Sequence, residues 1–253
     1  MFQYKKWQMN LLHYVGTFTV ISSFFLFPSW EGWAITIFAY YCTGCLGQTI
    51  TFHRYLSHGS FQYKYSWMEP VFSTFGALGG TGSGMLWAAI HKLHHKYSDT
   101  DKDPHGPHKG FWKPLLVVEY PEVDPRLVRR LFKKKYHVAT HKYYSLILLA
   151  YWTLLYLIGD LWLVAYAGIM PASIQIWISI TSSYFNHGWG YKNFEGLDDE
   201  ATNTWWLSIL TWGEAWHNNH HAKPWAWDFR YKWWEIDISG LTIKYLLMKK
   251  EVG

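Results

Sequence analysis

Two long apolar tracts that contain no lysine or arginine constrain the fold of this chain most strongly. The first runs from Leu11 to Phe52 and is interrupted only by Pro28-Ser-Trp-Glu-Gly32. The second runs from Tyr143 to Phe185 and is interrupted near Ala167-Gly-Ile-Met-Pro171. About 20 helical residues cross a bilayer core of roughly 30 Å, so each tract is long enough for two helices joined by a tight loop. The sequence predicts four transmembrane helices in two hairpins, about residues 9–52 and 143–187.

The positions of the basic residues test this topology independently. All 23 lysines and arginines lie in residues 1–6, 54–142 and 192–253. The positive-inside rule makes these stretches cytoplasmic, so we expect the termini and segments 53–142 and 188–253 on the cytoplasmic side of one membrane domain, 1–253. We expect no cleaved signal peptide, because the first apolar segment lacks a small-residue cleavage site and runs straight into a second span. No basic stripe accompanies a nucleic-acid-binding fold, so nucleic acid is not an expected partner.

Eight of the fourteen histidines form three short boxes. Imidazole is an ordinary protein ligand for iron, zinc and copper, and a cluster of this size predicts more than one metal ion. His187, at the cytoplasmic end of the fourth predicted span, is a ninth candidate ligand. The boxes are His53-Arg-Tyr-Leu-Ser-His58, His91-Lys-Leu-His94-His95 and His217-Asn-Asn-His220-His221.

Helical spacing distinguishes the boxes. An HxxHH box keeps its three imidazoles within roughly 100° of one α-helical face, whereas residues five apart are about 140° apart. His53 and His58 therefore either reach different metals or lie where the helix changes course. Carboxylates near the boxes could orient histidine N–H groups or serve as loop and cap residues; they are Asp99, Asp101, Asp103 and Glu214.

The glycine-rich stretch Pro70–Ile90 is apolar enough to be considered a further span. A crossing there would place the first two boxes on opposite sides of the membrane, and its glycines disfavour a long helix. We expect a buried or in-plane segment that brings the second box close to the first. Cys42 and Cys45 lie inside the second predicted span and are expected to act as small hydrophobic residues. His137 is expected to be interfacial or solvated, and His108 to belong to a structured loop.

Three extended motifs resemble the membrane fatty acid desaturase family, specifically its delta-9 acyl branch, and look more like its bacterial and cyanobacterial members. They are His53–His58, His91–His105 with its Asp-Thr-Asp-Lys-Asp-Pro-His ending, and Gly213-Glu-Ala-Trp-His-Asn-Asn-His-His221, followed by Trp233-Trp-Glu-Ile-Asp237. The resemblance implies an all-α integral membrane protein, with four transmembrane helices and a cytoplasmic helical cap that holds a di-iron site.

The same resemblance implies the ligand set and the reaction. Nine histidines would bind two Fe2+ ions, namely His53, His58, His91, His94, His95, His187, His217, His220 and His221. The family holds a water ligand through an Asn at the position of Ser183, so Ser183 is a candidate for a water-mediated ligand. The implied activity inserts a cis double bond, at the delta-9 position, into a saturated fatty acyl chain with O2 as co-substrate. The acyl carrier would be a lipid, coenzyme A or acyl carrier protein. Ala89 stands where animal members carry an Arg, which favours a carrier other than coenzyme A.

Electrons must come from a separate donor, because the chain has no heme-binding HPGG segment and no Cys-rich cluster. By the resemblance, this donor is of the ferredoxin or cytochrome b5 type. The basic run Arg129–Lys135 could dock such an acidic protein, or it could be a solvated or headgroup-facing patch.

A stripe at four-residue steps leads back from His53 along the second predicted span. It could line an acyl channel, with Tyr41 or Ile37 setting the chain length, or simply pack between helices. The stripe consists of Ile37, Tyr41, Cys45 and Thr49.

Other reaction classes remain open at this stage. A related di-iron hydroxylase, ketolase or fatty acid decarboxylase would use the same boxes. A membrane metal transporter needs ligands near the bilayer midplane, where the predicted spans offer only Asp160. A zinc hydrolase would use fewer histidines.

Overall fold

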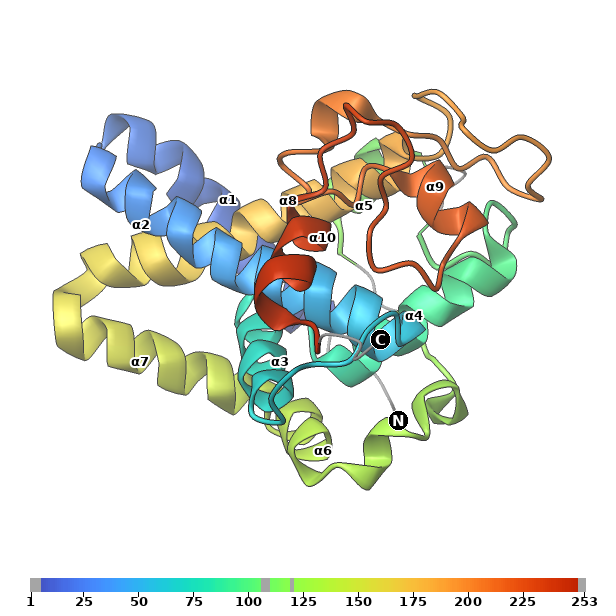
Figure 1. Ribbon diagram of the computed structural model, residues 1–253. Coiled ribbons are helices and arrows are strands. Elements are labelled where there is room, and N and C mark those ends of the chain that lie inside the picture. The colour runs from blue at the N-terminus through green and yellow to red at the C-terminus, as the bar shows by residue number, and fades with distance from the viewer. Residues whose placement is uncertain (1–5, 106–109, 119–120, 250–253) are drawn as a thin grey trace.

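The computed structural model describes residues 6–105, 110–118 and 121–249, and these ranges contain helices and isolated β-bridges but no strand. Two helical hairpins, α1–α2 and α7–α8, extend to one side as an arm, and the remaining helices gather on the other side (Figure 1). The elements are α1 Lys6–Phe25, α2 Trp30–Tyr40, η1 Tyr41–His58, α3 Met68–Leu78, α4 Gly84–Tyr97, α5 Trp112–Leu116, η3 Pro125–Val128, η4 Leu131–Lys133, α6 Lys135–Lys142, α7 Tyr144–Leu163, η5 Val164–Ile169, α8 Met170–Phe185, η6 Trp205–Leu207, α9 His217–Ala222, α10 Ile238–Thr242 and η7 Ile243–Leu247.

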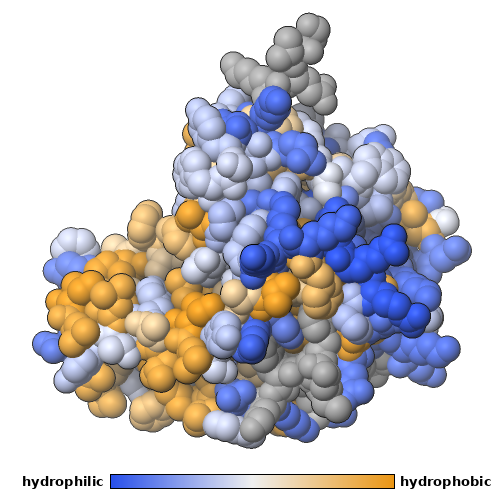
Figure 2. All heavy atoms as spheres, turned by 90° about the horizontal axis from the view of Figure 1, so that it is seen from below, coloured by the Kyte–Doolittle hydropathy of each residue, from blue (hydrophilic) through white to orange (hydrophobic). Residues whose placement is uncertain are grey.

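The outside of the arm is apolar. Phe25 at the end of α1 and Leu157 on α7 are 79% and 75% exposed. Figure 2 shows hydrophobic residues gathered over the arm and hydrophilic residues over the rest of the same face. Within the described ranges, one helical stretch, Tyr144–Phe185, is long and apolar enough to cross a membrane by length and composition. An exposed apolar surface of this kind indicates association with lipid or another protein.

The turn between α7 and α8 lies earlier than the sequence predicted. Residues 167–171 are not a loop, because η5 continues directly into α8. The backbone leaves helical geometry at Gly159 and at Asp160, whose φ of 54° is left-handed. Pro171 lies where η5 meets α8 and does not end the helix, because the carbonyls of Tyr166 and Ala167, five and four residues earlier, accept hydrogen bonds from the hydroxyls of Thr36 and Tyr151 and need no N–H from position 171. The first hairpin turns around Pro28, as expected.

Glycines allow α3 and α4 to pack closely on η1. A Cβ atom on Gly47 of η1 would lie 2.2 Å from the backbone nitrogen of Gly76 on α3. A Cβ on Gly84 would lie 2.7 Å from the ring of Phe52. The stretch Pro70–Ile90 therefore forms parts of two short helices, joined by a turn, that both contact η1. This packing brings the second histidine box to the first, as the sequence indicated.

Glu69 on α3 joins three parts of the fold. Its carboxylate accepts hydrogen bonds from Tyr55 of η1 (3.0 Å), from His137 of α6 (3.1 Å) and from Lys134. His137 is only 2% exposed, so the expectation that it is interfacial or solvated was wrong. Burial alone would raise the pKa of Glu69, but the hydrogen bonds from His137 and Lys134 lower this pKa to about 2.

Replacing Glu69 with Gln is expected to destabilise the fold by about 1–3 kcal/mol at pH 7, because buried donors lose a charged acceptor. The folded-state pKa lies below that of an ordinary glutamate, so this stabilisation is fully present above about pH 4.3 and is lost as the pH falls toward 2. Denaturant unfolding in detergent at pH 7 measures the difference. The exposed Glu122→Gln serves as the control, and equal stability of the two variants would contradict the assignment.

Candidate metal centre

The nine predicted histidines converge in two groups. They come from η1, α4, the residues just after α8, and α9. Within each group, one imidazole nitrogen of every residue lies within 4.8 Å of the others. The five-histidine group consists of His53, His58, His91, His95 and His220, and the four-histidine group consists of His94, His187, His217 and His221.

Each HxxHH box contributes to both groups. On α4, His91 and His95 stand one turn apart and join the five-histidine group, while His94 joins the four-histidine group. On α9 the division is reversed, because His217 and His221 belong to the four-histidine group and His220 to the other. Residues four apart share a helical face, so each helix presents a pair to one group and a single imidazole to the other.

The first box does not divide. His53 and His58 both join the five-histidine group because η1 is a π-helix, in which i→i+5 hydrogen bonding stacks residues five apart. Two side chains follow the same spacing: the hydroxyls of Thr51 and Ser57 donate to the carbonyls five residues earlier, at 2.6 and 2.8 Å. The spacing left open whether His53 and His58 reach different metals or lie where the helix changes course. The structure agrees with the second alternative, because the π-helical winding brings both side chains to one group.

The nitrogen positions fit metal coordination. The Nε2 atoms of His53 and His220 are 3.0 Å apart, and those of His187 and His217 are 3.1 Å apart. Two imidazoles about 2.1 Å from one ion at a right angle place their nitrogens about 3 Å apart. The Nε2 atoms of His94 and His221 are buried without a hydrogen-bond partner among the described residues. A metal ion would satisfy these atoms.

In several of these imidazoles, the Nδ1 atom, which is the ring nitrogen that does not face the group, contacts a carboxylate. His94 Nδ1 lies 3.0 Å from Asp103 and His187 Nδ1 lies 2.9 Å from Asp99. His53 Nδ1 contacts Glu214. A carboxylate at this position fixes the ring orientation and leaves Nε2 free for a metal. Three of the four predicted carboxylates thus contact one of the nine candidate ligands, whereas Asp101 is exposed.

Asp199 was missed by the sequence reasoning. Its carboxylate lies 2.6 Å from Nδ1 of His221. The residue stands in the acidic run Asp198-Asp199-Glu200, more than twenty positions before His221 and outside every box. The sequence carries no spacing signal that separates Asp199 from the exposed Asp198 beside it.

Burial keeps the imidazoles neutral, which is the state that binds metal. Desolvation, followed by repulsion from neighbouring imidazoles and cations, lowers the pKa of His58 to about 3 and that of His95 to about 2. Desolvation also lowers the pKa of His221, despite its contact with Asp199. The histidines whose pKa burial lowers well below the ordinary value are His53, His91, His94, His217 and His220.

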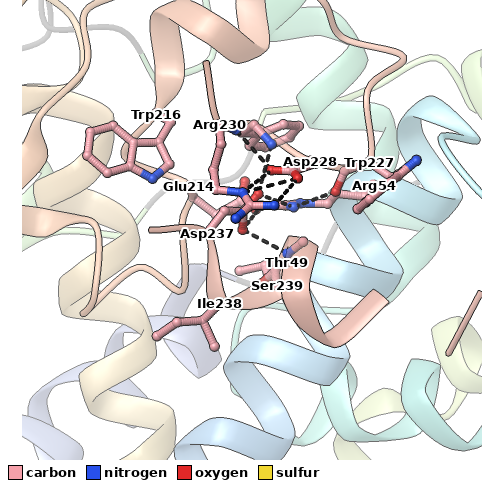
Figure 3. A network of polar contacts seen from close by, with 12 residues as sticks. Thr49, Arg54, Glu214, Trp216, Trp227, Asp228, Arg230, Asp237, Ile238 and Ser239 are labelled. Carbon is pink, nitrogen blue, oxygen red and sulfur yellow. Dashed lines mark hydrogen bonds and ion pairs between the residues drawn. The ribbon is translucent and has the colours of Figure 1, made fainter. Parts of the chain in front are cut away.

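A fully buried arginine organises the surroundings of His53 (Figure 3). Arg54 donates to Glu214 Oε1 at 3.0 Å and to Asp237 Oδ2 at 2.7 Å, and its guanidinium stacks 3.8 Å from the ring of Phe229. Burial raises the pKa of Glu214 to about 7, although Arg54 opposes this shift. The network joins the first box, the third box and Asp237, and so holds η1 to the C-terminal part of the chain.

A cavity of about 650 Å³ adjoins both histidine groups. His53 and His187 line it, as do Tyr40, Gln48 and Thr49 from α2 and η1. Of the predicted channel stripe, only Thr49 is among the lining residues. The π-helical winding turns positions at four-residue steps progressively away from one line.

The other stripe residues lie elsewhere. Ile37 is 60% exposed, Tyr41 lies 3.4 Å from Thr242, and Cys45 is buried 3.4 Å from Ser239. Ser183 does line the cavity, together with His187 and His217, and its hydroxyl donates to the carbonyl of Ser179 at 2.8 Å. His108 lies outside the described residues.

These features define a helical protein with an exposed apolar surface and a histidine-rich candidate metal centre. The family model for fatty acid desaturases matches residues 28–237, a range that includes all nine histidines. The chain belongs to this family.

Named relatives extend over most of the chain. An sn-2 palmitoyl-lipid 9-desaturase of Nostoc sp. is 33% identical over 243 residues, covering 90% of this chain and 84% of the relative. An sn-1 stearoyl-lipid 9-desaturase of Synechocystis sp. is also 33% identical, over 93% of this chain and 74% of the relative. Delta-9 acyl-lipid desaturase 2 of Arabidopsis thaliana is 28% identical over 95% of this chain and 81% of the relative.

Replacing Asp199 with Asn should lower metal affinity about 10- to 100-fold, because a neutral amide oxygen accepts the hydrogen bond from His221 Nδ1–H more weakly than a carboxylate and no longer raises the basicity of Nε2. Metal content measured by mass spectrometry after a chelator challenge tests this. The neighbouring Asp198→Asn is the matched control. Equal metal retention by both variants would mean that Asp199 does not support the site.

Proposed function

We propose that the protein is an O2-dependent di-iron desaturase that inserts a cis double bond at the delta-9 position of a saturated acyl chain carried by a membrane lipid. The observation that carries this proposal is the position of the two histidine groups beside one cavity, in a chain of the fatty acid desaturase family. The names of the relatives support an acyl-lipid substrate and the delta-9 position.

The histidine groups would each hold one Fe2+ ion. The five-histidine group would hold one ion, and the four-histidine group, with water at Ser183 as a further ligand, would hold the other. Two ferrous ions and O2 supply the oxidising power that removal of hydrogen from an unactivated methylene requires. The protein itself keeps the imidazoles neutral, orients them through carboxylates and places their nitrogens beside the cavity.

The membrane arrangement belongs to the same proposal. Four spans in two hairpins, with termini and histidines on the cytoplasmic side, are supported by the absence of lysine and arginine from both apolar tracts. The exposed apolar surface of α1 and α7 supports it as well. Substrate lipid would then reach the cavity from the membrane in which the arm is embedded.

An external electron donor of the ferredoxin or cytochrome b5 type completes the reaction. Exposed basic side chains on η3, η4 and the adjoining turns offer a surface for an acidic donor. Arg130 on this surface donates to the carbonyls of Tyr55 and Leu56, next to His58. A donor docked here would lie close to the five-histidine group.

Gly44 lies behind three side chains of the cavity wall that could limit the acyl chain length. A Cβ on Gly44 would lie 2.5 Å from Gln175 Oε1, 2.7 Å from the ring of Tyr40 and 2.9 Å from Trp212 Nε1. Gln175, Tyr40 and Trp212 all line the cavity. These residues, rather than Ile37 and Tyr41, would therefore set the acyl chain length.

Expression in a host with a suitable donor, followed by gas chromatography–mass spectrometry of lipid fatty acids with derivatisation to locate double bonds, tests the reaction. We expect a new cis-monoene that His94→Ala abolishes, because His94 is a ligand of the four-histidine group. The control His141→Ala changes a histidine outside both groups and should retain the product. Hydroxylated chains or terminal alkenes would instead indicate a different reaction at the same site.

The Gly44→Ala variant tests the channel. The added methyl group pushes Gln175 and Tyr40 into the cavity, so the ratio of shorter to longer monoene products should rise. Cys42→Ala, two residues earlier and absent from the cavity lining, should leave the ratio unchanged. The same ratio in the Gly44 variant and the native protein would show that the chain end lies elsewhere.

A further inference from the structure

A short apolar segment follows the second hairpin, in a region that the basic residues assign to the cytoplasm. Residues 201–213 contain no charged residue, whereas Glu200 and Glu214 stand on either side. The segment comprises η6 and the turns after it. Its sequence is Ala-Thr-Asn-Thr-Trp-Trp-Leu-Ser-Ile-Leu-Thr-Trp-Gly.

The segment has two faces. Leu207, Ser208 and Thr211 are buried against the protein. The other face carries four large apolar side chains that are between 45% and 62% exposed. A soluble surface seldom leaves such a contiguous group uncovered. These exposed residues are Trp205, Trp206, Ile209 and Leu210.

Contacts with the end of α2 place the segment beside a proposed membrane span. The hydroxyl of Tyr40 donates to the carbonyl of Leu210 at 2.6 Å, and the rings of Tyr40 and Trp212 have centroids 5.1 Å apart. Tyr40 lies ten residues after Trp30, where the helix begins, and therefore about 15 Å along its axis. That length is half of a bilayer core of roughly 30 Å.

Five backbone N–H groups of the segment are satisfied within it, and insertion into lipid favours such internal hydrogen bonding. The N–H groups of Leu207, Ser208, Thr211, Trp212 and Gly213 each donate to a carbonyl three to five residues earlier. The hydroxyls of Ser208 and Thr211 also donate to carbonyls of the same turns. The exposed face consists of apolar and indole side chains. Indoles favour the boundary between lipid and water.

We propose that residues 205–212 form a re-entrant element that enters the cytoplasmic leaflet without crossing it, with Trp205, Trp206, Ile209 and Leu210 in contact with lipid. The occupant of this surface is the acyl region of the bilayer, since the surface continues from α2, a proposed span. The inference rests on the two-hairpin membrane arrangement proposed above. On its inner side, Thr211 and Trp212 line the cavity, so this one layer of protein separates lipid from the cavity.

Site-specific fluorescence in proteoliposomes tests the proposal. Cys42 and Cys45 are replaced with Ala, and Ile209→Cys is labelled with nitrobenzoxadiazole in detergent before reconstitution. Leu157→Cys on α7 is the lipid-facing control, and the exposed Glu195→Cys is the aqueous control. We expect the label at position 209 to match that at position 157, with blue-shifted emission, quenching by doxyl groups on lipid chains and no quenching by iodide.

The controls separate the possible failures. Iodide quenching at position 209 but not at position 157 would overturn the re-entrant element and leave the hairpins intact. Iodide quenching at both positions would overturn the membrane arrangement itself. Protection at position 209 from both quenchers would mean that protein, such as a second copy of this chain, covers the segment, and would also overturn the proposal. Leu210→Cys repeats the measurement one residue further along, should the label at 209 disturb folding.

Discussion

The structure depends on holding nine largely buried imidazoles with their ring nitrogens a few ångströms apart. Several neighbouring elements bring these imidazoles together. Glycines let α3 and α4 approach η1 until the second box meets the first. The β-bridges from His187 to Ala201 and from Asn203 to Trp216 hold the segments beside the last ligands. Desolvation then keeps the rings uncharged, and carboxylates behind four of them fix the direction in which each ring points.

Buried charge is balanced in the same region. Arg54 is fully buried, which would be unfavourable without partners, and it is paired with Asp237 and Glu214 from the C-terminal part of the chain. Because Glu214 also contacts His53, the pairing joins electrostatic balance to ligand orientation. The chain closes around the histidines through this contact, although the residues involved are about 160 to 180 positions apart in sequence.

Sequence patterns predicted the features that repeat at helical spacing. The boxes, His187, three supporting carboxylates and the helical class could all be read from residue type and interval. The π-helical winding of η1 could not, because it has no compositional signature, and this winding determines that His53 and His58 share a group and that Tyr40 rather than Tyr41 lines the cavity. Asp199 and His137 were missed because their partners are distant in sequence. The turn at Gly159 was missed because Pro171 is a stronger signal for a break than Gly-Asp.

The division of each HxxHH box between the two groups has a mechanical consequence. His91, His94 and His95 are fixed on one rigid helix, as are His217, His220 and His221 on another. A rotation of either helix that improves the geometry of one group disturbs the geometry of the other, so neither group can adjust independently. A metal ion in one group would therefore restrain both helices and preset the other group, so we expect the two positions to fill cooperatively without contact between the ions.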